Sequence, residues 1–171
     1  MQPLTYLFLH CSATDPLRSR WNADRIRRAH MDPVAKGGRG WDRPGYRVYI
    51  EVGGKVVRLI EANDDAWVQP GEVSWGVGPA FNGISHHICY EGGLANGAPT
   101  DTRDLAQRNA MLEICNWYIS KHPNIQILGH NQVANKACPS FFVPHWGDAV
   151  GLPSHNLDRR DPFGYGKIFK A

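Results

Sequence analysis

Five short runs of strand-forming residues, separated by helical segments, constrain the fold of this chain more than any other feature of its sequence. Each run shows two-residue alternation or enrichment in branched and aromatic side chains, which favours a β-strand. The runs are residues 4–11, 46–52, 55–60, 84–91 and 125–129. Gly53 and Gly54 join the second run to the third and predict a two-residue hairpin turn, so at least these two strands should be antiparallel.

Two segments between these runs have the pattern of helices. The first begins after Asn22, a residue type that caps helices, and ends at Pro33. The second is expected to be capped near Asp101 or Thr102 and to end at Pro123. Its expected buried face consists of Leu105, Met111, Leu112, Cys115, Tyr118 and Ile119. Strands that alternate with helices and a hairpin predict an α/β fold with a central mixed β-sheet flanked by α-helices.

A length of 171 residues is enough to bury one hydrophobic core without disulfide bonds. We therefore expect a single domain with its core at residues 4–145 and an irregular C-terminal tail over residues 146–171, where no periodicity is seen. Two segments rich in Gly, Pro and Asn, residues 33–45 and 61–83, are long for connections. Segments of this kind often surround a binding cleft.

Charge and cysteine content exclude several classes of protein. A net charge of +3 is modest, and the only local basic cluster, Arg25, Arg27 and Arg28, has the pattern of a solvated helix face. This is not a nucleic-acid footprint, so no nucleic-acid partner is expected. The four cysteines form no C-x-x-C pair and are expected to be reduced. The N-terminus lacks the positive start of a signal peptide and the length of a membrane span. We expect a monomer that is made in the cytoplasm and does not enter a membrane.

Histidine and cysteine residues lie at the ends of two expected strands. His10 lies at the end of the first run, His130 directly follows the last, and Cys138 returns from a short loop. If the two strands are neighbours, two imidazoles and a thiolate form a three-ligand zinc set with an open position for water. A thiol nucleophile with a histidine base, or a buried cysteine near an unrelated histidine, is also compatible with this spacing. Pro139 argues against the nucleophile, because reactive cysteines usually lie at helix N-termini.

Five segments of the sequence match one known family in the same order. They are LFLHCSAT (7–14), RIRRAHMDP (25–33), GWDRPGYRVYIEVGG (40–54), ICYEGG (88–93) and GHNQVANKACPSF (129–141). With these segments the chain resembles the type-2 N-acetylmuramoyl-L-alanine amidase family, which includes phage lysozyme-type amidases and animal peptidoglycan recognition proteins. The resemblance implies the fold of that family, again a mixed sheet flanked by helices.

The resemblance also implies a zinc-dependent enzyme that cleaves the lactyl-L-alanine amide bond of peptidoglycan. It implies one zinc ion per chain, held by His10, His130 and Cys138, and it nominates Tyr46 and Lys136 as the catalytic pair. Zinc lowers the pKa of bound water to about 7, and an ammonium and a phenol hydroxyl can stabilise a developing oxyanion. From the residues alone, Lys136 could merely favour the thiolate, and Tyr46 could merely pack as an aromatic residue.

The sequence departs from the pattern of the family at two positions. Trp75 lies where many members have a cleft histidine; it can stack on a sugar or a peptide stem but cannot bind metal. Ser140 lies where glycine is common and could change the loop after the cysteine. We expect Trp75, Asn82 and His86 to contact the substrate.

Strand alternation limits the roles of the other histidines and cysteines. Neighbours in a strand face opposite sides, so at most one of His86 and His87 can reach a cleft. There it would line the groove or bond to a ligand histidine, and a role as a rim or packing residue is the alternative. By the same alternation Cys11 faces away from His10 and should be a buried thiol. The other histidines are expected on the surface or in the tail: His30, His122, His145 and His155.

Two classes of function follow from the resemblance. The first is a cell-wall lytic enzyme such as a phage endolysin, which acts on peptidoglycan after release from the cytoplasm. The second is a peptidoglycan-binding or regulatory protein that has lost catalysis; such members often lack the cysteine ligand, so Cys138 favours an enzyme. Some phage amidases of this kind also bind a phage RNA polymerase, but no feature of this sequence specifies such a surface.

Overall fold

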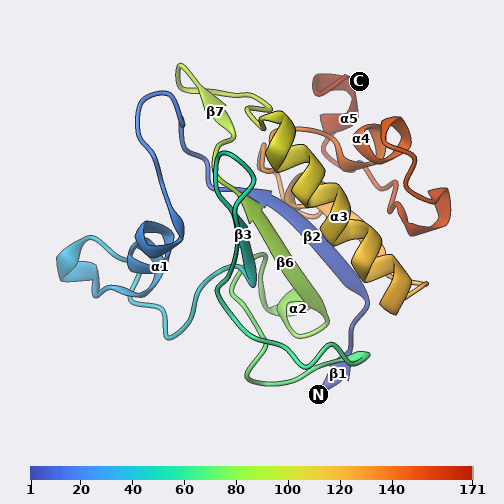
Figure 1. Cartoon of the computed structure of the whole chain (residues 1–171), viewed down its shortest axis with the longest axis horizontal. Helices are drawn as coiled ribbons and strands as arrows, with labels where there is room; N and C mark the ends of the chain where they lie inside the picture. The colour runs from blue at the N-terminus through green and yellow to red at the C-terminus, as the bar shows by residue number, and fades with distance from the viewer. Residues whose placement is uncertain (171) are drawn as a thin grey trace.

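A five-stranded β-sheet forms the centre of the computed structural model, which describes residues 1–170 (Figure 1). The strand order is β4-β3-β6-β2-β9. The strands are β2 (Tyr6–Cys11), β3 (Val48–Ile50), β4 (Val56–Arg58), β6 (Ser85–Tyr90) and β9 (Gln126–Gly129). All neighbours are parallel except β3 and β4, which pair antiparallel. The five predicted strands and the mixed sheet are therefore confirmed.

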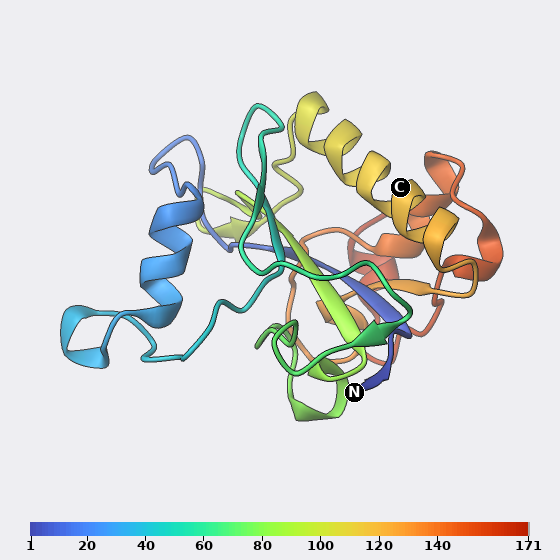
Figure 2. The ribbon, with the colours of Figure 1, turned by 60° about the horizontal axis from the view of Figure 1, so that its bottom comes forward.

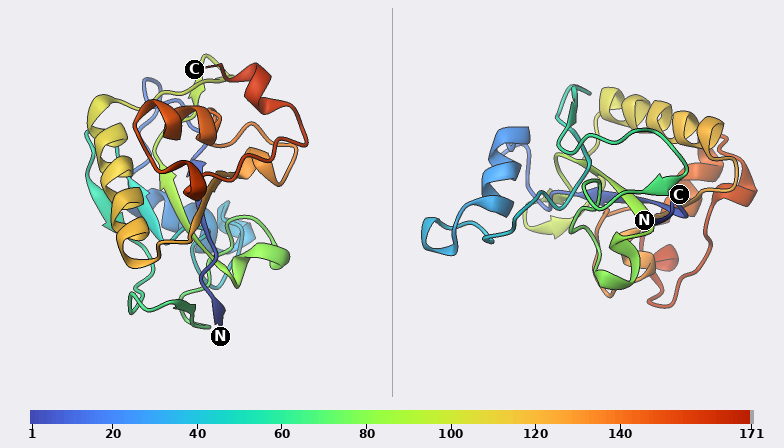
Figure 3. Two further views of the ribbon diagram at one scale, coloured as in Figure 1. Left: turned by 90° about the vertical axis from the view of Figure 1, so that its right-hand side faces the viewer. Right: turned by 90° about the horizontal axis from the view of Figure 1, so that it is seen from below.

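Helices and short elements surround this sheet. The helices are α1 (Ala23–Met31), α2 (Pro79–Asn82), α3 (Leu105–Lys121), α4 (Val143–Ala149) and α5 (Tyr165–Ile168), with 3-10 turns η1 (Val34–Lys36), η2 (His130–Gln132) and η3 (Ser154–Asn156). Two short ribbons pair β1 (Gln2–Pro3) with β5 (Trp67–Val68) and β7 (Leu94–Ala95) with β8 (Ala98–Pro99). Helix α3 lies on one side of the sheet and α2 on the other (Figure 2 and Figure 3). Within residues 1–170, no helix has the length and apolarity needed to span a membrane.

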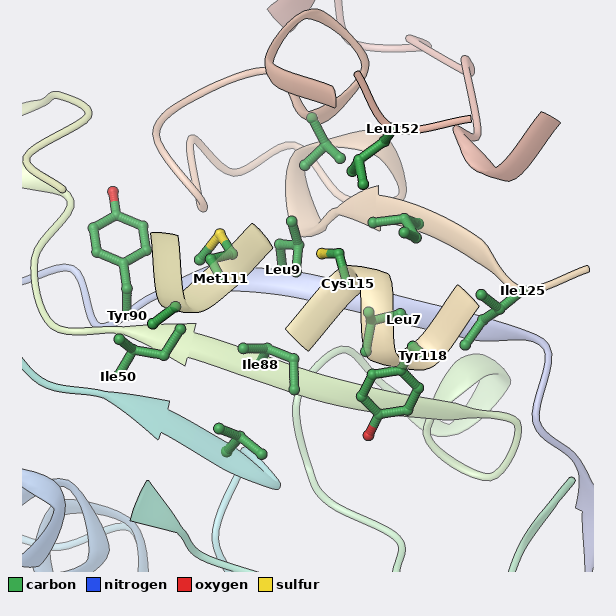
Figure 4. Close-up of a cluster of buried hydrophobic side chains, with 14 of the residues drawn as sticks. Leu7, Leu9, Ile50, Ile88, Tyr90, Met111, Cys115, Tyr118, Ile125 and Leu152 are labelled. Atoms are coloured by element: carbon green, nitrogen blue, oxygen red, sulfur yellow. The ribbon is translucent and has the colours of Figure 1, made fainter. Parts of the chain in front are cut away.

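The main hydrophobic core lies between α3 and the sheet (Figure 4). Leu9 of β2 and Ile88 of β6 pack there with Met111 and Cys115 of α3, and all four side chains are fully buried. Successive side chains of a strand point to opposite faces. His10 therefore points to the face that α3 does not cover, where α1 packs on a second, smaller core.

The start of α3 differs from the prediction. Its N-cap is Asp104 rather than Asp101 or Thr102, because Asp104 and Gln107 form a reciprocal capping box. The Asp104 carboxylate accepts the backbone N–H of Gln107 at 2.7 Å, and the Gln107 side chain accepts that of Asp104 at 3.1 Å. Two donors of the first turn are thereby satisfied within the chain.

Burial in the first turn of α3 also differs from the prediction. Leu105, expected in the core, is the first helical residue and is 74% exposed. Gln107 is fully buried instead, and its amide donates to the carbonyl oxygens of Ile50 and Glu91 at the ends of β3 and β6. Met111, Cys115 and the following turn keep the predicted face.

Replacing Asp104 with Ala should lower the free energy of unfolding by about 1–2 kcal/mol. The substitution removes the acceptor of the Gln107 N–H and of the Gly53 N–H, which lies 2.7 Å from the carboxylate. Urea denaturation measures the change. Asp24→Ala in α1 is the control, since its carboxylate makes only an exposed 3.9 Å ion pair and should cost about 0.5 kcal/mol or less. Equal losses in the two variants would contradict the assigned cap.

The hairpin between β3 and β4 has a longer turn than predicted. The N–H of Glu51 donates to the carbonyl oxygen of Lys55, which leaves Val52, Gly53 and Gly54 in the turn. Both glycines have positive φ, +87° and +82°. Glycine adopts this conformation without the steric cost of a Cβ atom, so the pair forms the turn as expected, but in a three-residue loop.

Residues 146–170 do not form the irregular tail that their lack of periodicity predicts. This segment begins within α4 and contains η3 and α5, and Leu152 and Leu157 are buried in the main core. The side-chain amide of Asn156 donates to the carbonyl oxygens of Pro123 and Ile125, at 2.8 Å each. Leu157 also forms a parallel β-bridge with β9. These contacts attach the segment to the edge of the sheet, although its elements are too short to show periodicity.

Candidate metal centre and active site

The ends of two parallel strands bring His10 and His130 together. Strands β2 and β9 are neighbours in the sheet, as the zinc hypothesis requires. His10 is the penultimate residue of β2, and His130 follows β9 directly. Their ring centroids are 5.1 Å apart. The two imidazoles therefore emerge at the same edge of the sheet.

Cys138 joins this pair from the loop after η2. The backbone N–H of Asn131 donates to the carbonyl oxygen of Cys138 at 2.7 Å and so closes the loop. The Sγ of Cys138 lies 3.6 Å from Nδ1 of His10 and accepts the backbone N–H of Cys11 at 3.3 Å. One potential ligand atom from each of the three residues lies within 4.8 Å of the other two. The fold thus gathers the three residues that were predicted to bind metal.

Both imidazoles of this cluster are electrically suited to metal ligation. Burial, followed by the effect of the neighbouring His130, lowers the pKa of His10 well below its usual value. Burial, followed by the positive charge of Lys136, lowers the pKa of His130 to about 4. At pH 7 both rings are therefore neutral, the form that binds a metal ion. Within residues 1–170 the buried Nε2 of His130 has no hydrogen-bond partner, so no protein group competes for it.

An open cavity of about 540 Å³ lies over the cluster. His130 and Cys138 form part of its wall, and Lys136 lies beside them. The long segments 33–45 and 61–83 supply much of the remaining wall, including aromatic side chains. These segments were predicted to surround a cleft, and the structure agrees.

Tyr46 and Lys136 both line this cavity, as the catalytic assignment requires. The Tyr46 ring centroid is 5.2 Å from that of His10, although the residue lies just before β3 rather than in it. Burial raises the pKa of the Tyr46 hydroxyl well above its usual range, so the phenol keeps its proton and can donate at neutral pH. The exposed Lys136 ammonium adds a positive charge close to both imidazoles.

Trp75 and Asn82 also line the cavity, but they differ in what they can offer a substrate. The indole of Trp75 is 39% exposed, and its N–H donates to Asp42 at 2.8 Å, which holds the ring at the cavity wall. Asn82 is buried, and its Oδ1 accepts the backbone N–H groups of Val77 and Gly78 at 3.0 and 3.1 Å. Asn82 therefore holds the cavity loop, and its oxygen is already occupied.

His86 does not lie in the cavity, so the prediction that it contacts substrate is wrong. It is buried on the side of the sheet covered by α3. There its Nδ1 lies 2.9 Å from the hydroxyl of Tyr118 and 3.3 Å from the guanidinium of Arg47. His87, its neighbour in β6, faces His10 instead, so the two histidines do lie on opposite faces of the sheet.

His86 should make the protein less stable in acid. Burial, followed by the charge of Arg47, lowers the pKa of His86 to about 3, whereas it is about 6.5 in an unfolded chain. Between these two pKa values only the unfolded state binds the proton. The free energy of unfolding therefore falls as pH falls, by about 1.4 kcal/mol per pH unit. Urea denaturation of the metal-free protein at pH 7 and pH 5 should show about 2 kcal/mol more loss in the wild type than in His86→Gln. Equal losses would contradict this buried neutral state.

His30 belongs to the cavity, although it was expected on the surface. It is buried, stacks on Trp41 at 5.0 Å, and its Nδ1 accepts the backbone N–H of Gly45 at 3.2 Å. Its ring centroid is also 5.2 Å from that of Tyr46. The basic residues nearby suggested a solvated helix face, but the four-residue spacing from buried Ile26 places His30 on the inner side of α1.

Ser140 retains the backbone conformation that glycine would favour. Its φ is +68°, in the left-handed region, and its buried hydroxyl donates to the carbonyl oxygen of Gly93 at 2.8 Å. This hydrogen bond helps to hold the loop after Cys138 in place. The Sγ of Cys11 lies 3.7 Å from this hydroxyl, and Cys11 is the buried thiol that alternation predicts.

Comparison with known proteins assigns the chain to a family. A sequence model described as N-acetylmuramoyl-L-alanine amidase matches residues 1–141, a span that includes the three clustered residues and the cavity. The endolysin of Enterobacteria phage K11 is 30% identical over 150 residues, which cover 85% of this chain and 86% of that protein.

Two solved structures share the fold at lower sequence identity. The Ph2119 endolysin from Thermus scotoductus MAT2119 bacteriophage Ph2119 aligns with 92% of this chain and 87% of its own, with a TM-score of 0.63 and 23% identity. Drosophila PGRP-LB aligns with 90% of this chain and 84% of its own, with a TM-score of 0.60 and 18% identity. The family match over most of the chain and the phage relative together decide the assignment. This chain belongs to the N-acetylmuramoyl-L-alanine amidase family.

Proposed function

We propose that this protein is a zinc-dependent N-acetylmuramoyl-L-alanine amidase that hydrolyses the bond between the lactyl group and the first L-alanine of peptidoglycan. The family supplies the reaction class, and the phage K11 relative supports a role as an endolysin that acts on the cell wall after release. The observation that carries the proposal is the cluster of His10, His130 and Cys138 beside an open cavity.

The cluster fits zinc in both chemistry and spacing. Two nitrogens and one sulfur are a common donor set for catalytic zinc and leave one position open. With Zn–N of about 2.05 Å, Zn–S of about 2.3 Å and a tetrahedral angle, nitrogen and sulfur ligands lie about 3.6 Å apart. The Nδ1 of His10 and the Sγ of Cys138 are separated by 3.6 Å. One zinc ion per chain would supply a Lewis acid and an activated water at neutral pH.

The remaining cavity residues would bind the substrate and stabilise the transition state. The protonated hydroxyl of Tyr46 would donate to the carbonyl oxygen of the scissile amide as negative charge develops there. The Lys136 ammonium would stabilise the same charge from the open side of the cavity. Trp75 would pack against a sugar ring or the peptide stem.

Digestion of peptidoglycan sacculi tests this function. The purified protein should contain about one zinc ion per chain and should release free stem peptides with a new N-terminal alanine, identified by mass spectrometry. Disaccharides or shortened peptides as products would contradict the amidase assignment. Zinc-loaded protein that binds sacculi and releases nothing would instead indicate a peptidoglycan-binding protein without catalysis.

A further inference from the structure

His87 begins a buried chain of hydrogen bonds that leads away from His10. Nε2 of His10 lies 3.0 Å from Nδ1 of His87, and Nε2 of His87 lies 2.9 Å from Oγ of Ser85. The Ser85 hydroxyl in turn donates to the carbonyl oxygen of Phe81 at 2.7 Å. The side chains of His10, His87 and Ser85 are all fully buried. These hydrogen bonds are therefore shielded from solvent.

The direction of this chain is set by the carbonyl at its end. Because a carbonyl oxygen only accepts, Ser85 donates to Phe81 and must accept from His87. A neutral His87 then carries its proton on Nε2 and offers a bare Nδ1, to which His10 donates from Nε2. The Nδ1 of His10, which faces the sulfur of Cys138, is left with its lone pair free.

We propose that His87 is a positioning residue of the metal centre, which holds His10 in the tautomer and ring orientation that present Nδ1 to zinc. The inference rests on the proposed function, since it requires a metal ion at the cluster. Hydrogen-bond partners of this kind change metal affinity by about 10- to 100-fold. His87 acts through His10, so its effect should appear in metal binding itself.

Gly76 provides the space that His87 occupies. A Cβ atom at position 76 would lie 2.3 Å from Nδ1 of His87, far inside van der Waals contact. The ring of Phe8 stacks on the His87 imidazole with centroids 5.4 Å apart, which restricts where the imidazole can move. The φ of Gly76 is not positive, so an alanine there would test this contact without backbone strain.

Zinc affinity, measured by competition with a chromogenic chelator, tests the inference. His87→Leu removes the acceptor and should weaken zinc binding about 10- to 100-fold. His87→Asn should retain most of the affinity, because its oxygen can take the place of Nδ1. His86→Leu is the matched control: it removes the neighbouring buried histidine on the other face and should leave zinc affinity unchanged.

A double-variant comparison separates His87 from general packing of the cavity loop. Gly76→Ala should weaken zinc binding in the wild type but should have no further effect in the His87→Leu background. If His87→Leu fails to fold, Gly76→Ala and His87→Asn still give opposite expected results. An equal effect of Gly76→Ala in both backgrounds, or wild-type affinity in His87→Leu, would overturn the inference and leave the amidase proposal intact. A wild-type protein that binds no zinc would overturn both.

Discussion

Replacing Cys138 with Ser should abolish zinc retention and peptidoglycan hydrolysis together. The substitution removes the only sulfur donor of the cluster, and a serine hydroxyl does not ionise near pH 7 to replace it as a zinc ligand. We expect zinc content near zero by metal analysis and a loss of activity on sacculi of about 10³-fold or more. Cys115→Ser is the matched control. Cys115 is a residue of α3 whose thiol is buried in the main core, so its replacement should not change the zinc content.

Chelation separates this result from thiol catalysis. The 3.6 Å distance between Sγ of Cys138 and Nδ1 of His10 would also suit a thiol-imidazole pair. A zinc enzyme loses its activity when a chelator removes the metal and regains it when zinc is added back. An enzyme with a cysteine nucleophile loses activity in the Cys138→Ser variant but resists the chelator. Chelator-resistant hydrolysis by the wild type would therefore contradict the proposed mechanism.

Removing the hydroxyl of Tyr46 should reduce turnover about 10²- to 10³-fold without loss of zinc. Tyr46→Phe keeps the ring that packs near His10 and lines the cavity, and it deletes only the hydroxyl group. Turnover on sacculi and zinc content should be measured on the same preparation. A lower activity with full zinc content would place the role of Tyr46 in the transition state rather than in the metal site.

Tyr49→Phe provides the control for this substitution. Tyr49 is a buried tyrosine of β3 whose hydroxyl donates to the backbone carbonyl of Trp21 at 2.6 Å, outside the cavity wall. Its loss should affect stability and leave turnover nearly unchanged. Wild-type turnover in Tyr46→Phe, or a similar loss of turnover in both variants, would remove Tyr46 from the catalytic assignment.

Strand alternation predicts which face of the sheet His86 and His87 occupy, but not the contacts that they make there. Ile88 and Tyr90 are apolar and share the face of His86, which marks that face as the one packed against α3. The same alternation puts His87, and not the nominated His86, on the side of His10, so the signal that corrects the prediction was present in the sequence. The hydrogen bond between the two rings was not, because it depends on the parallel register of β2 and β6 and on the space left by Gly76.

Non-local contacts account for the elements that were misjudged. The N-cap of α3 lies at Asp104, where the local capping box with Gln107 is joined by a hydrogen bond from the N–H of Gly53 in a distant hairpin. Leu157 is buried because a neighbouring strand offers it a pairing partner, not because of any periodicity in its own segment. His30 is buried because Trp41 and Gly45 fold back onto α1.

The sequence by itself determined the five strands, the mixed α/β sheet and the positions of His10 and His130 at strand ends, because alternation and turn residues act locally along the chain. Only the tertiary structure decided that Sγ of Cys138 lies 3.6 Å from Nδ1 of His10 and that Nδ1 of the buried His87 lies 3.0 Å from Nε2 of the same ring. These distances depend on strand order, register and side-chain packing between residues far apart in sequence. No pattern within a single segment encodes them.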